Sequence, residues 1–337
     1  MPENSACEEG CTMEKDVIME ISNLKKYFPV QGSIRVQPAA VKAVDDVTLK
    51  VYRNETLSLV GESGCGKSTT GRCAIGLLKA TDGSIKYNGK EITNLSSGKR
   101  RELTKEMQMI FQDPYSSLNP RMTVGSILEE TLQIHHTVKN KSERLERAME
   151  MFLKVGMRED QFYRYPHEFS GGQKQRIGIA RALMLNPKLV VCDEPVSALD
   201  VSIQSQILNL LTKMKEERSI TYIFISHNMS VVRYMSDRVG VMYLGHLVEL
   251  APTEELYTRP LHPYTKALLS AVPEVNPHEK KEKIKLEGDI PSPLNPPSGC
   301  VFHNRCPYAT TFCGDAVPTM QEIAKDHFVA CFRHEEY

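Results

Sequence analysis

Length, composition and charge exclude several classes of protein. The chain has 337 residues, enough for one large domain or two, and its 41% hydrophobic and 25% charged residues are typical of a globular protein. Its 42 Lys and Arg residues balance 42 Asp and Glu residues, which argues against a nucleic-acid coat or a basic membrane anchor. No apolar run approaches the ~20 residues that span a bilayer, and the acidic N-terminus lacks the features of a signal peptide. We therefore expect a cytosolic protein that reaches a membrane only through another subunit.

Three segments follow one another along the chain. Residues 1–16 indicate a disordered tail. From 17 to 250, strand-like apolar runs alternate with helical patterns, which predicts an α/β domain. Within this domain, residues 115–170 carry little strand signal and predict a mainly helical insertion. Residues 251–337 differ from the preceding domain in residue pattern, with more prolines, a charge run and four cysteines, and predict a small C-terminal extension.

Several elements can be placed individually. Strands are expected at residues 56–60, 189–192 and 221–226, where short apolar runs occur. A helix is predicted over residues 142–155, with Ser142 as its N-cap and Gly156 as its stop.

Prolines and a run of charged residues divide the extension into segments. Residues 254–272 have a helical pattern interrupted by prolines, and the charge run at 278–287 indicates a solvated linker. Residues 291–297 hold four prolines in seven, which predicts a stiff, extended segment.

The strongest chemical signal is a glycine-rich loop after the first predicted strand. Gly61, Gly64, Gly66, Lys67 and Ser68 fit the pattern G-x-x-x-x-G-K-[S/T]. The glycines let backbone N–H groups point at phosphate oxygens, the lysine reaches the β- and γ-phosphates, and the serine hydroxyl can bind Mg²⁺. A glycine-rich turn with an incidental lysine is the alternative, but the preceding strand and the following helical pattern favour the phosphate loop.

Two further patterns are weaker when each stands alone. The apolar run at 189–192 ends in Asp193 and Glu194, which could complete a Mg²⁺ shell and polarise a water; acids that begin a helix are the alternative. Ser170, followed by two glycines and Gln173, could cradle an anion at a helix N-terminus, although a plain loop has the same composition.

Taken together in this order, the motifs resemble those of ATP-binding cassette (ABC) ATPases over residues 17–250. The resemblance implies a P-loop NTPase core of α/β class with a helical subdomain, an N-terminal antiparallel β subdomain and the C-terminal extension. It implies catalytic roles for Glu194 as base, His227 as switch histidine and Gln112 as Q-loop glutamine, with Mg²⁺ held by Ser68, Gln112 and Asp193. Residues implied to contact ATP are Gly61, Ser63, Gly64, Cys65, Gly66, Lys67, Ser68, Thr69, Asp193 and, in a second protomer, Ser170, Gly171, Gly172, Gln173 and Asp200.

Two details qualify the resemblance. Phe28 occupies the family register for an aromatic that stacks on adenine, with Tyr27 as runner-up and ordinary core packing as the alternative. Phe169 stands before the signature where many family members have Leu, and we expect no loss of function from it.

A narrower resemblance covers the Q-loop and the extension. Residues 111–124 (FQDPYSSLNPRMTV), 260–264 (PLHPY) and the run PSPLNPPSGCVFHNRCP resemble ATPase subunits of oligopeptide and dipeptide importers, the second of the two ATPases more than the first. This implies import of peptides at the cytoplasmic face of the membrane. The implied partners are a second ATPase subunit that differs from this chain in sequence, two permeases and, indirectly, a solute-binding protein. Nickel, glutathione and other small-solute importers share these features.

Four late cysteines pose a separate question. Cys300, Cys306, Cys313 and Cys331 are spaced C-x5-C-x6-C-x17-C, which matches neither the usual zinc pairs nor the common ferredoxin patterns. Spacing therefore leaves a cluster, zinc and free thiols open, whereas the subfamily resemblance implies a [4Fe–4S] cluster. Because the proline-rich stretch separates these cysteines from the ATP motifs, we expect a structural appendage whose loss spares ATP binding.

Two other functions compete with the importer. A soluble ABC ATPase of DNA repair or translation usually carries tandem cassettes or long coiled coils, and here one cassette is present with no net charge. A redox- or metal-sensing regulator with an inactive cassette is disfavoured because Glu194 and His227 are both in place.

Overall fold

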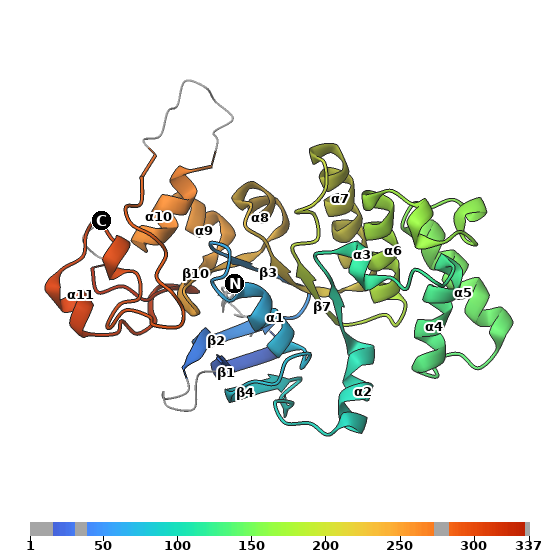
Figure 1. Ribbon diagram of the computed structural model, residues 1–337, viewed down its shortest axis with the longest axis horizontal. Coiled ribbons are helices and arrows are strands. Elements are labelled where there is room, and N and C mark those ends of the chain that lie inside the picture. The colour runs from blue at the N-terminus through green and yellow to red at the C-terminus, as the bar shows by residue number, and fades with distance from the viewer. Residues whose placement is uncertain (1–15, 31–38, 273–282, 334–337) are drawn as a thin grey trace, which may run out of the picture.

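The computed structural model describes residues 16–30, 39–272 and 283–333. Two sheets form the centre, a helical lobe lies at one end of the long axis and the C-terminal extension lies at the other (Figure 1). The expected tail at residues 1–16 lies outside the described residues except for Asp16, and so does part of the charge run.

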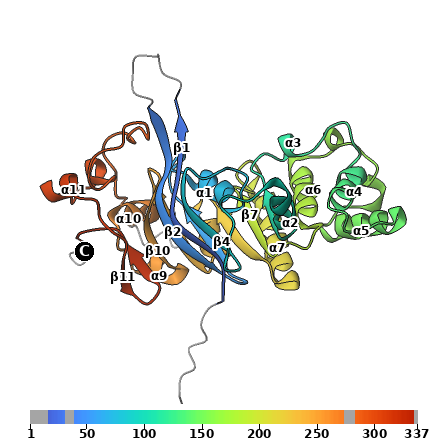
Figure 2. The same ribbon diagram turned by 90° about the horizontal axis from the view of Figure 1, so that it is seen from below.

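An antiparallel sheet is formed by the first part of the chain, as the ABC resemblance implied. Its strands lie in the order β2 (Ala40–Tyr52), β1 (Val17–Pro29), β4 (Asp82–Tyr87) and β5 (Lys90–Glu91). Helix α1 (Lys67–Ala74) lies between this sheet and the larger one, since Cys73 and Ala74 share a core with residues of both. Figure 2 shows the antiparallel sheet in the middle of the molecule, beside α1.

The larger sheet has eight strands and carries the buried parallel core. In order they are β11 (Gln321–Ala324), β12 (His327–Val329), β10 (His246–Pro252), β9 (Arg238–Tyr243), β3 (Thr56–Val60), β8 (Thr221–Ile225), β7 (Leu189–Asp193) and β6 (Met107–Ile110). Strands β9, β3, β8, β7 and β6 are parallel. Every residue of β3, β7 and β8 is buried, which explains why these strands appear in the sequence as continuous apolar runs.

Helices enclose this sheet and build the lobe. They are α2 (Ser97–Glu106), α3 (Pro114–Ser117), α4 (Val124–Ile134), α5 (Lys141–Lys154), α6 (Gly171–Leu183), α7 (Val201–Arg218), α8 (Met229–Met235), α9 (Thr253–Thr258), α10 (Pro263–Ser270) and α11 (Thr311–Asp315), with short 3₁₀ turns at Glu159–Gln161, Pro166–Glu168 and His303–Arg305. Between residues 115 and 170 the described chain contains helices and no strand.

The predicted N-cap of α5 was wrong by two residues. The cap is Asn140, whose side chain accepts a hydrogen bond from the backbone N–H of Ser142. Both residue types favour an N-cap, so only the backbone conformation decides between them. The predicted stop at Gly156 follows the helix and has a φ of 80°.

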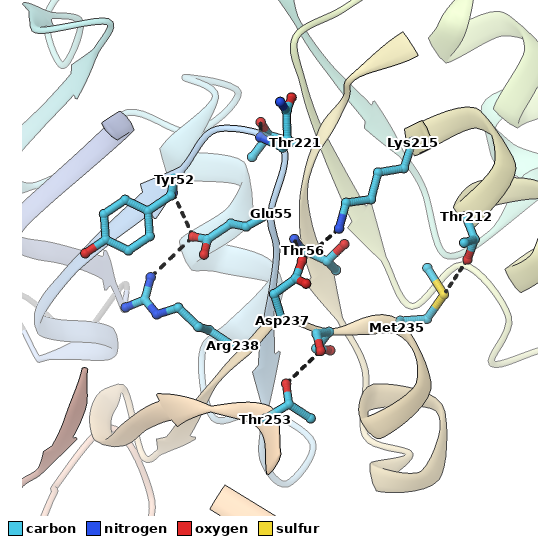
Figure 3. A network of polar contacts seen from close by, with 12 residues as sticks. Tyr52, Glu55, Thr56, Thr212, Lys215, Thr221, Met235, Asp237, Arg238 and Thr253 are labelled. Carbon is cyan, nitrogen blue, oxygen red and sulfur yellow. Dashed lines mark hydrogen bonds and ion pairs between the residues drawn. The ribbon is translucent and has the colours of Figure 1, made fainter. Parts of the chain in front are cut away.

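A polar network secures the ends of β3 and β9 that lie away from the glycine loop (Figure 3). Arg238, at the start of β9, pairs with Glu55 at 3.3 Å, and both side chains are buried. Asp237 accepts a hydrogen bond from the Thr56 backbone N–H at 2.7 Å and pairs with Lys215 of α7 at 2.7 Å. These contacts set where both strands begin, and therefore where β3 delivers the chain into the glycine loop.

The extension is continuous with the central sheet. Strand β12 pairs with β10 through Glu249–Val329 and Leu250–Phe328, so residue 250, the expected boundary, lies inside a strand. The proline-rich segment also packs against the core, because the carbonyl of Pro293 accepts a hydrogen bond from the backbone N–H of Lys42 in β2 at 3.0 Å. The expectation of an isolating spacer is therefore wrong.

Candidate active site

The glycine loop between β3 and α1 is held in a conformation that only glycine tolerates at two positions. Gly61 has a φ of +147°, and a Cβ there would lie 2.1 Å from the carbonyl oxygen of Met242. Gly66 has a φ of +103°, and its Cβ would lie 2.2 Å from the carbonyl oxygen of Ala43. Strand β9 and strand β2 therefore press on the loop from either side, and the loop presents its backbone N–H groups at the start of α1.

Lys67 is buried at the first turn of α1, with 4% of its surface exposed. Its Nζ donates to the carbonyl oxygens of Gly61 at 2.8 Å and Glu62 at 2.9 Å, within the loop itself. An ammonium group held at this point can exchange a carbonyl partner for a phosphate oxygen, which carries a full charge and makes the stronger hydrogen bond.

The next residue joins the loop to the end of β7. The Ser68 hydroxyl donates to the fully buried Asp193 at 2.5 Å, and Arg72, one turn later, pairs with the other carboxylate oxygen at 3.2 Å. A hydroxyl and a carboxylate that converge beside a phosphate loop match the small set of protein ligands that Mg²⁺ takes when phosphates supply the rest. The sequence pattern predicted Ser68 and Asp193; it did not predict Arg72.

Glu194 lies at the centre of a second group of side chains. Its carboxylate accepts a hydrogen bond from Gln112 Nε2 at 2.9 Å, and its other oxygen lies 3.3 Å from His227 Nδ1. Its φ of 44° is uncommon for a residue with a side chain, and its backbone N–H is fixed by the carbonyl of Ile225 at 3.0 Å. Strand ends of β6, β7 and β8 thus place the three predicted catalytic residues together.

Residues of both groups line one open cavity of about 490 Å³. Its lining residues are Ala43, Ser63, Gly64, Gly66, Lys67, Ser68, Thr69, Gln112, Glu194 and His227. The volume suits a nucleotide-sized ligand. All of these except Ala43 are sequence-predicted site residues, and Ala43 is a small residue with no motif to reveal it.

Comparison with known proteins identifies the class of this site. Residues 44–197 match the family described as "ABC transporter", and residues 248–313 match "Oligopeptide/dipeptide transporter, C-terminal region". The oligopeptide transport ATP-binding protein AppF of Bacillus subtilis is 53% identical over 94% of this chain and 97% of its own length. OppF of Salmonella typhimurium is 52% identical over 95% of this chain and 97% of its own length. The chain belongs to this family of ABC ATPases.

Solved structures agree with the family in the ATPase core. The post-hydrolysis dimer of the ATP-binding cassette MJ0796 matches with a TM-score of 0.63 and 26% identity, over 70% of this chain and 98% of that one. The cbiO1 protein of Clostridium perfringens matches with a TM-score of 0.61 and 26% identity, over 72% of this chain and 92% of that one. As an ABC ATPase, the chain is an ATP-hydrolysing transporter subunit, and the ABC fold expected from its motifs is confirmed.

The signature residues lie apart from the cavity. Ser170 caps α6 reciprocally with Gln173: its hydroxyl accepts from the Gln173 backbone at 3.4 Å, and the Gln173 side chain accepts from the Ser170 backbone at 3.0 Å. Ser170 is exposed, and none of Ser170–Gln173 or Asp200 is among the described residues that line the cavity. The signature therefore lies at an exposed, capped helix N-terminus outside the cavity.

The two candidate aromatics for adenine differ in their surroundings. The Tyr27 hydroxyl donates to Asp45 at 2.5 Å and is committed there. Phe28 is 37% exposed and pairs across strands with Val41, two residues before Ala43, which lines the cavity. The ammonium of Lys26 lies 4.9 Å from the centre of the Phe28 ring. The Phe28 ring is therefore exposed, whereas the Tyr27 hydroxyl already has a partner, and the choice between them as stacking residue stays a prediction.

The four late cysteines surround one small cavity of about 20 Å³, with His262 and Phe302 beside them. Burial raises the pKa of the Cys300 thiol to about 11, and burial also raises the pKa of Cys306 and Cys331. Among the described residues, however, no group of three or more His, Cys, Asp or Glu side chains is placed to hold a metal ion. The structure brings the cysteines together but does not support the [4Fe–4S] cluster that the resemblance implied.

Proposed function

We propose that this chain binds and hydrolyses ATP to energise the import of peptides. The observation that carries the substrate class is the near-full-length similarity to oligopeptide transport proteins, including the extension that matches the oligopeptide/dipeptide family. Importers of nickel or glutathione are the alternative, because the ATPase itself does not touch the solute.

The residues that line the cavity suit phosphoryl transfer to water. Lys67 and the loop amides neutralise charge on the transferred phosphoryl group, and Ser68, Gln112 and Asp193 would hold the Mg²⁺ that shields the β- and γ-phosphates. Glu194, held between Gln112 and His227, orients the attacking water and accepts its proton. Catalysis then depends mainly on positioning and electrostatics.

We infer that the working unit is a pair of ATPase subunits. Ser170 and Asp200 are exposed and lie outside the lining of this chain's own cavity, which leaves the signature available to ATP held by a partner. A related subunit is the proposed partner, together with two permeases and, through them, a solute-binding protein. The described residues contain no helix long and apolar enough to cross a membrane. The proposed place of attachment is the cytoplasmic face, through the permeases.

Transport reconstitution tests the substrate class. The full complex in vesicles, with its binding protein, should couple ATP hydrolysis to uptake of a labelled tripeptide, and Glu194→Gln in this chain should abolish uptake. Glutathione and Ni²⁺ are the competing solutes. Stimulation of hydrolysis by either of these, with no response to tri- or pentapeptides, would contradict peptide import while leaving the ATPase assignment intact.

We further propose that Cys300, Cys306, Cys313 and Cys331 bind an iron–sulfur cluster. Four half-buried thiols around one cavity form a soft donor set, which suits a soft cation or cluster once the thiols are deprotonated. The described cysteines are not placed to hold a metal ion as they stand, so the proposed cluster requires the sulfurs to move.

Anaerobic purification tests this site directly. We expect brown protein with visible charge-transfer absorbance and about four irons per chain. Cys306→Ser should bleach the absorbance, whereas Cys73→Ser, a buried cysteine of α1, should not. Zinc in place of iron after the same preparation would overturn the cluster.

A further inference from the structure

A charged pair joins the cysteine-bearing segment to the phosphate loop. Arg305, the residue before Cys306, donates to both carboxylate oxygens of Glu62, at 2.8 and 3.1 Å. Its side chain is 8% exposed and that of Glu62 is 26% exposed. This is a two-pronged guanidinium–carboxylate contact, the geometry in which arginine binds most strongly and with most directional control.

A second contact reaches the same loop residue from α10. The backbone N–H of Glu62 donates to the hydroxyl of Tyr264 at 2.8 Å, and the Tyr264 ring is fully buried. Tyr264 packs against Tyr243 and against Phe302, two residues after Cys300, with ring centres 4.8 and 5.4 Å apart respectively. The extension thus holds both the side chain and the backbone of Glu62.

Glu62 stands directly beside the residues that meet the nucleotide. Its carbonyl oxygen accepts a hydrogen bond from Lys67 Nζ at 2.9 Å, and the next two residues, Ser63 and Gly64, line the cavity. A displaced Glu62 would therefore move both the lysine and the loop amides. Its carboxylate, if left without Arg305, would place an unpaired negative charge at the residue that precedes the cavity-lining part of the phosphate loop.

We propose that Arg305 and Tyr264 are positioning residues of the ATP site. They hold Glu62 in place and neutralise it, so that the phosphate loop is preorganised for the triphosphate. The cysteine-bearing segment is then part of the nucleotide site and not an appendage to it. ATP affinity depends on this segment being docked, whichever group the cysteines bind.

Equilibrium titration of the full chain with a fluorescent ATP analogue and Mg²⁺ tests the proposal. Arg305→Gln leaves the Glu62 carboxylate unpaired and should raise Kd about tenfold, equivalent to about 1.4 kcal/mol. The double variant Glu62→Gln with Arg305→Gln removes both charges and should recover most of that loss. Recovery ties the loss of affinity to the unpaired Glu62 charge, and urea unfolding of the same variants separates this effect from general destabilisation.

Matched controls complete the experiment. Arg233→Gln breaks an exposed pair with Glu254 at 3.1 Å, on helices α8 and α9, and should leave Kd unchanged. Tyr264→Phe keeps the ring and changes no charge, and we expect it to raise Kd about threefold through the lost hydrogen bond. If Arg305→Gln does not fold, the Kd of Tyr264→Phe tests the proposal in its place.

Two results would overturn the proposal. One is an ATP affinity of folded Arg305→Gln and Tyr264→Phe equal to that of the wild type. The other is a double variant that binds as weakly as Arg305→Gln alone, since the effect would then be structural and independent of the Glu62 charge.

Discussion

At the scale of single residues, the position of Glu194 matters most. It follows a buried strand, has a left-handed backbone conformation and receives hydrogen-bonding groups from two other strand ends. A carboxylate held in this way is oriented before any substrate arrives, so little of the barrier to reaction is spent on aligning it.

Replacing Glu194 with Gln should slow ATP hydrolysis by about 10²–10⁴-fold, because the amide retains the shape but cannot accept a proton. ATP binding should persist, and the variant should accumulate as a closed dimer on gel filtration with ATP. Glu254→Gln, an exposed carboxylate on α9, is the control. Turnover of Glu194→Gln near the wild-type rate would show that another group takes the proton.

Substitutions at Ser170 and at Lys67 should impair different steps, ATP hydrolysis in the first case and ATP binding in the second. Ser170→Arg fills the exposed N-terminus of α6 and should block hydrolysis while the monomer binds ATP normally, if this end serves a partner's nucleotide as we propose. Lys67→Ala removes a charged contact to phosphate and should weaken ATP binding itself, by about tenfold or more. Calorimetric titration of each monomer separates the two; weak binding by Ser170→Arg would show that the signature acts within its own chain.

At the scale of secondary-structure elements, polar contacts at strand beginnings align the parallel sheet. Arg238 joins β9 to Glu55, at the turn that leads into β3, and Asp237 binds the first N–H of β3 (Figure 3). Apolar packing alone specifies the burial of a strand that is buried on both faces, but leaves its offset along the strand direction less well defined. Directional polar contacts supply that offset.

Arg238→Met should destabilise the fold by about 3–5 kcal/mol, because it leaves the Glu55 carboxylate buried without its partner charge. Urea unfolding measures the loss. Adding Glu55→Gln should recover part of it, since the second change removes the unpaired charge. Lys215→Met breaks the more exposed pair with Asp237 and should cost about 0–1 kcal/mol. Equal losses of unfolding free energy in Arg238→Met and Lys215→Met would contradict the expectation that the more buried ion pair contributes more to stability.

At the scale of the whole molecule, a buried polar cluster fastens the extension to the ATPase core. Glu249 of β10 is fully buried and accepts hydrogen bonds from the backbone N–H groups of Leu261 and His262, and it pairs with His327 of β12 at 2.8 Å. His262 caps α10 by accepting from the Tyr264 N–H at 3.1 Å. Together with the Arg305–Glu62 pair, these contacts make the extension and the core one unit.

Acid should loosen this unit. Burial lowers the pKa of His262 from 6.5 to about 4, although Glu249 opposes the shift. Between these values the unfolded chain binds the proton that the folded chain excludes, so this contribution to stability is complete above pH 6.5 and is lost as the pH falls. Going from pH 6.5 to 5 should cost about 2 kcal/mol from this group.

A comparison of two proteins isolates this effect. His262→Asn can keep the cap but does not titrate, so its urea-unfolding free energy should fall less on acidification, by about that 2 kcal/mol. Identical pH dependence in wild type and variant would show that other groups cause the acid lability.

Local sequence determined the ATPase core and most of its site. The loop at 61–69, the acids at 193–194 and the runs that became β3, β7 and β8 are each defined within a few residues, because backbone conformation, helix-end charge and strand burial leave short patterns. Gln112 and His227 follow strands of the same parallel sheet, so sequence order alone placed them at the correct edge. The comparisons bear out the family to which these motifs pointed.

Only the tertiary structure decided how the extension relates to the core. Arg305 and Glu62 are 243 positions apart, and neither stands in a pattern that reports a partner. The proline-rich segment at 291–297 has the composition of a free spacer, yet a hydrogen bond to β2 and the strand pairing of β12 with β10 hold this region against the core. Long-range contacts depend on which surfaces meet after folding, and that information is spread over the whole chain and leaves no local periodicity to detect.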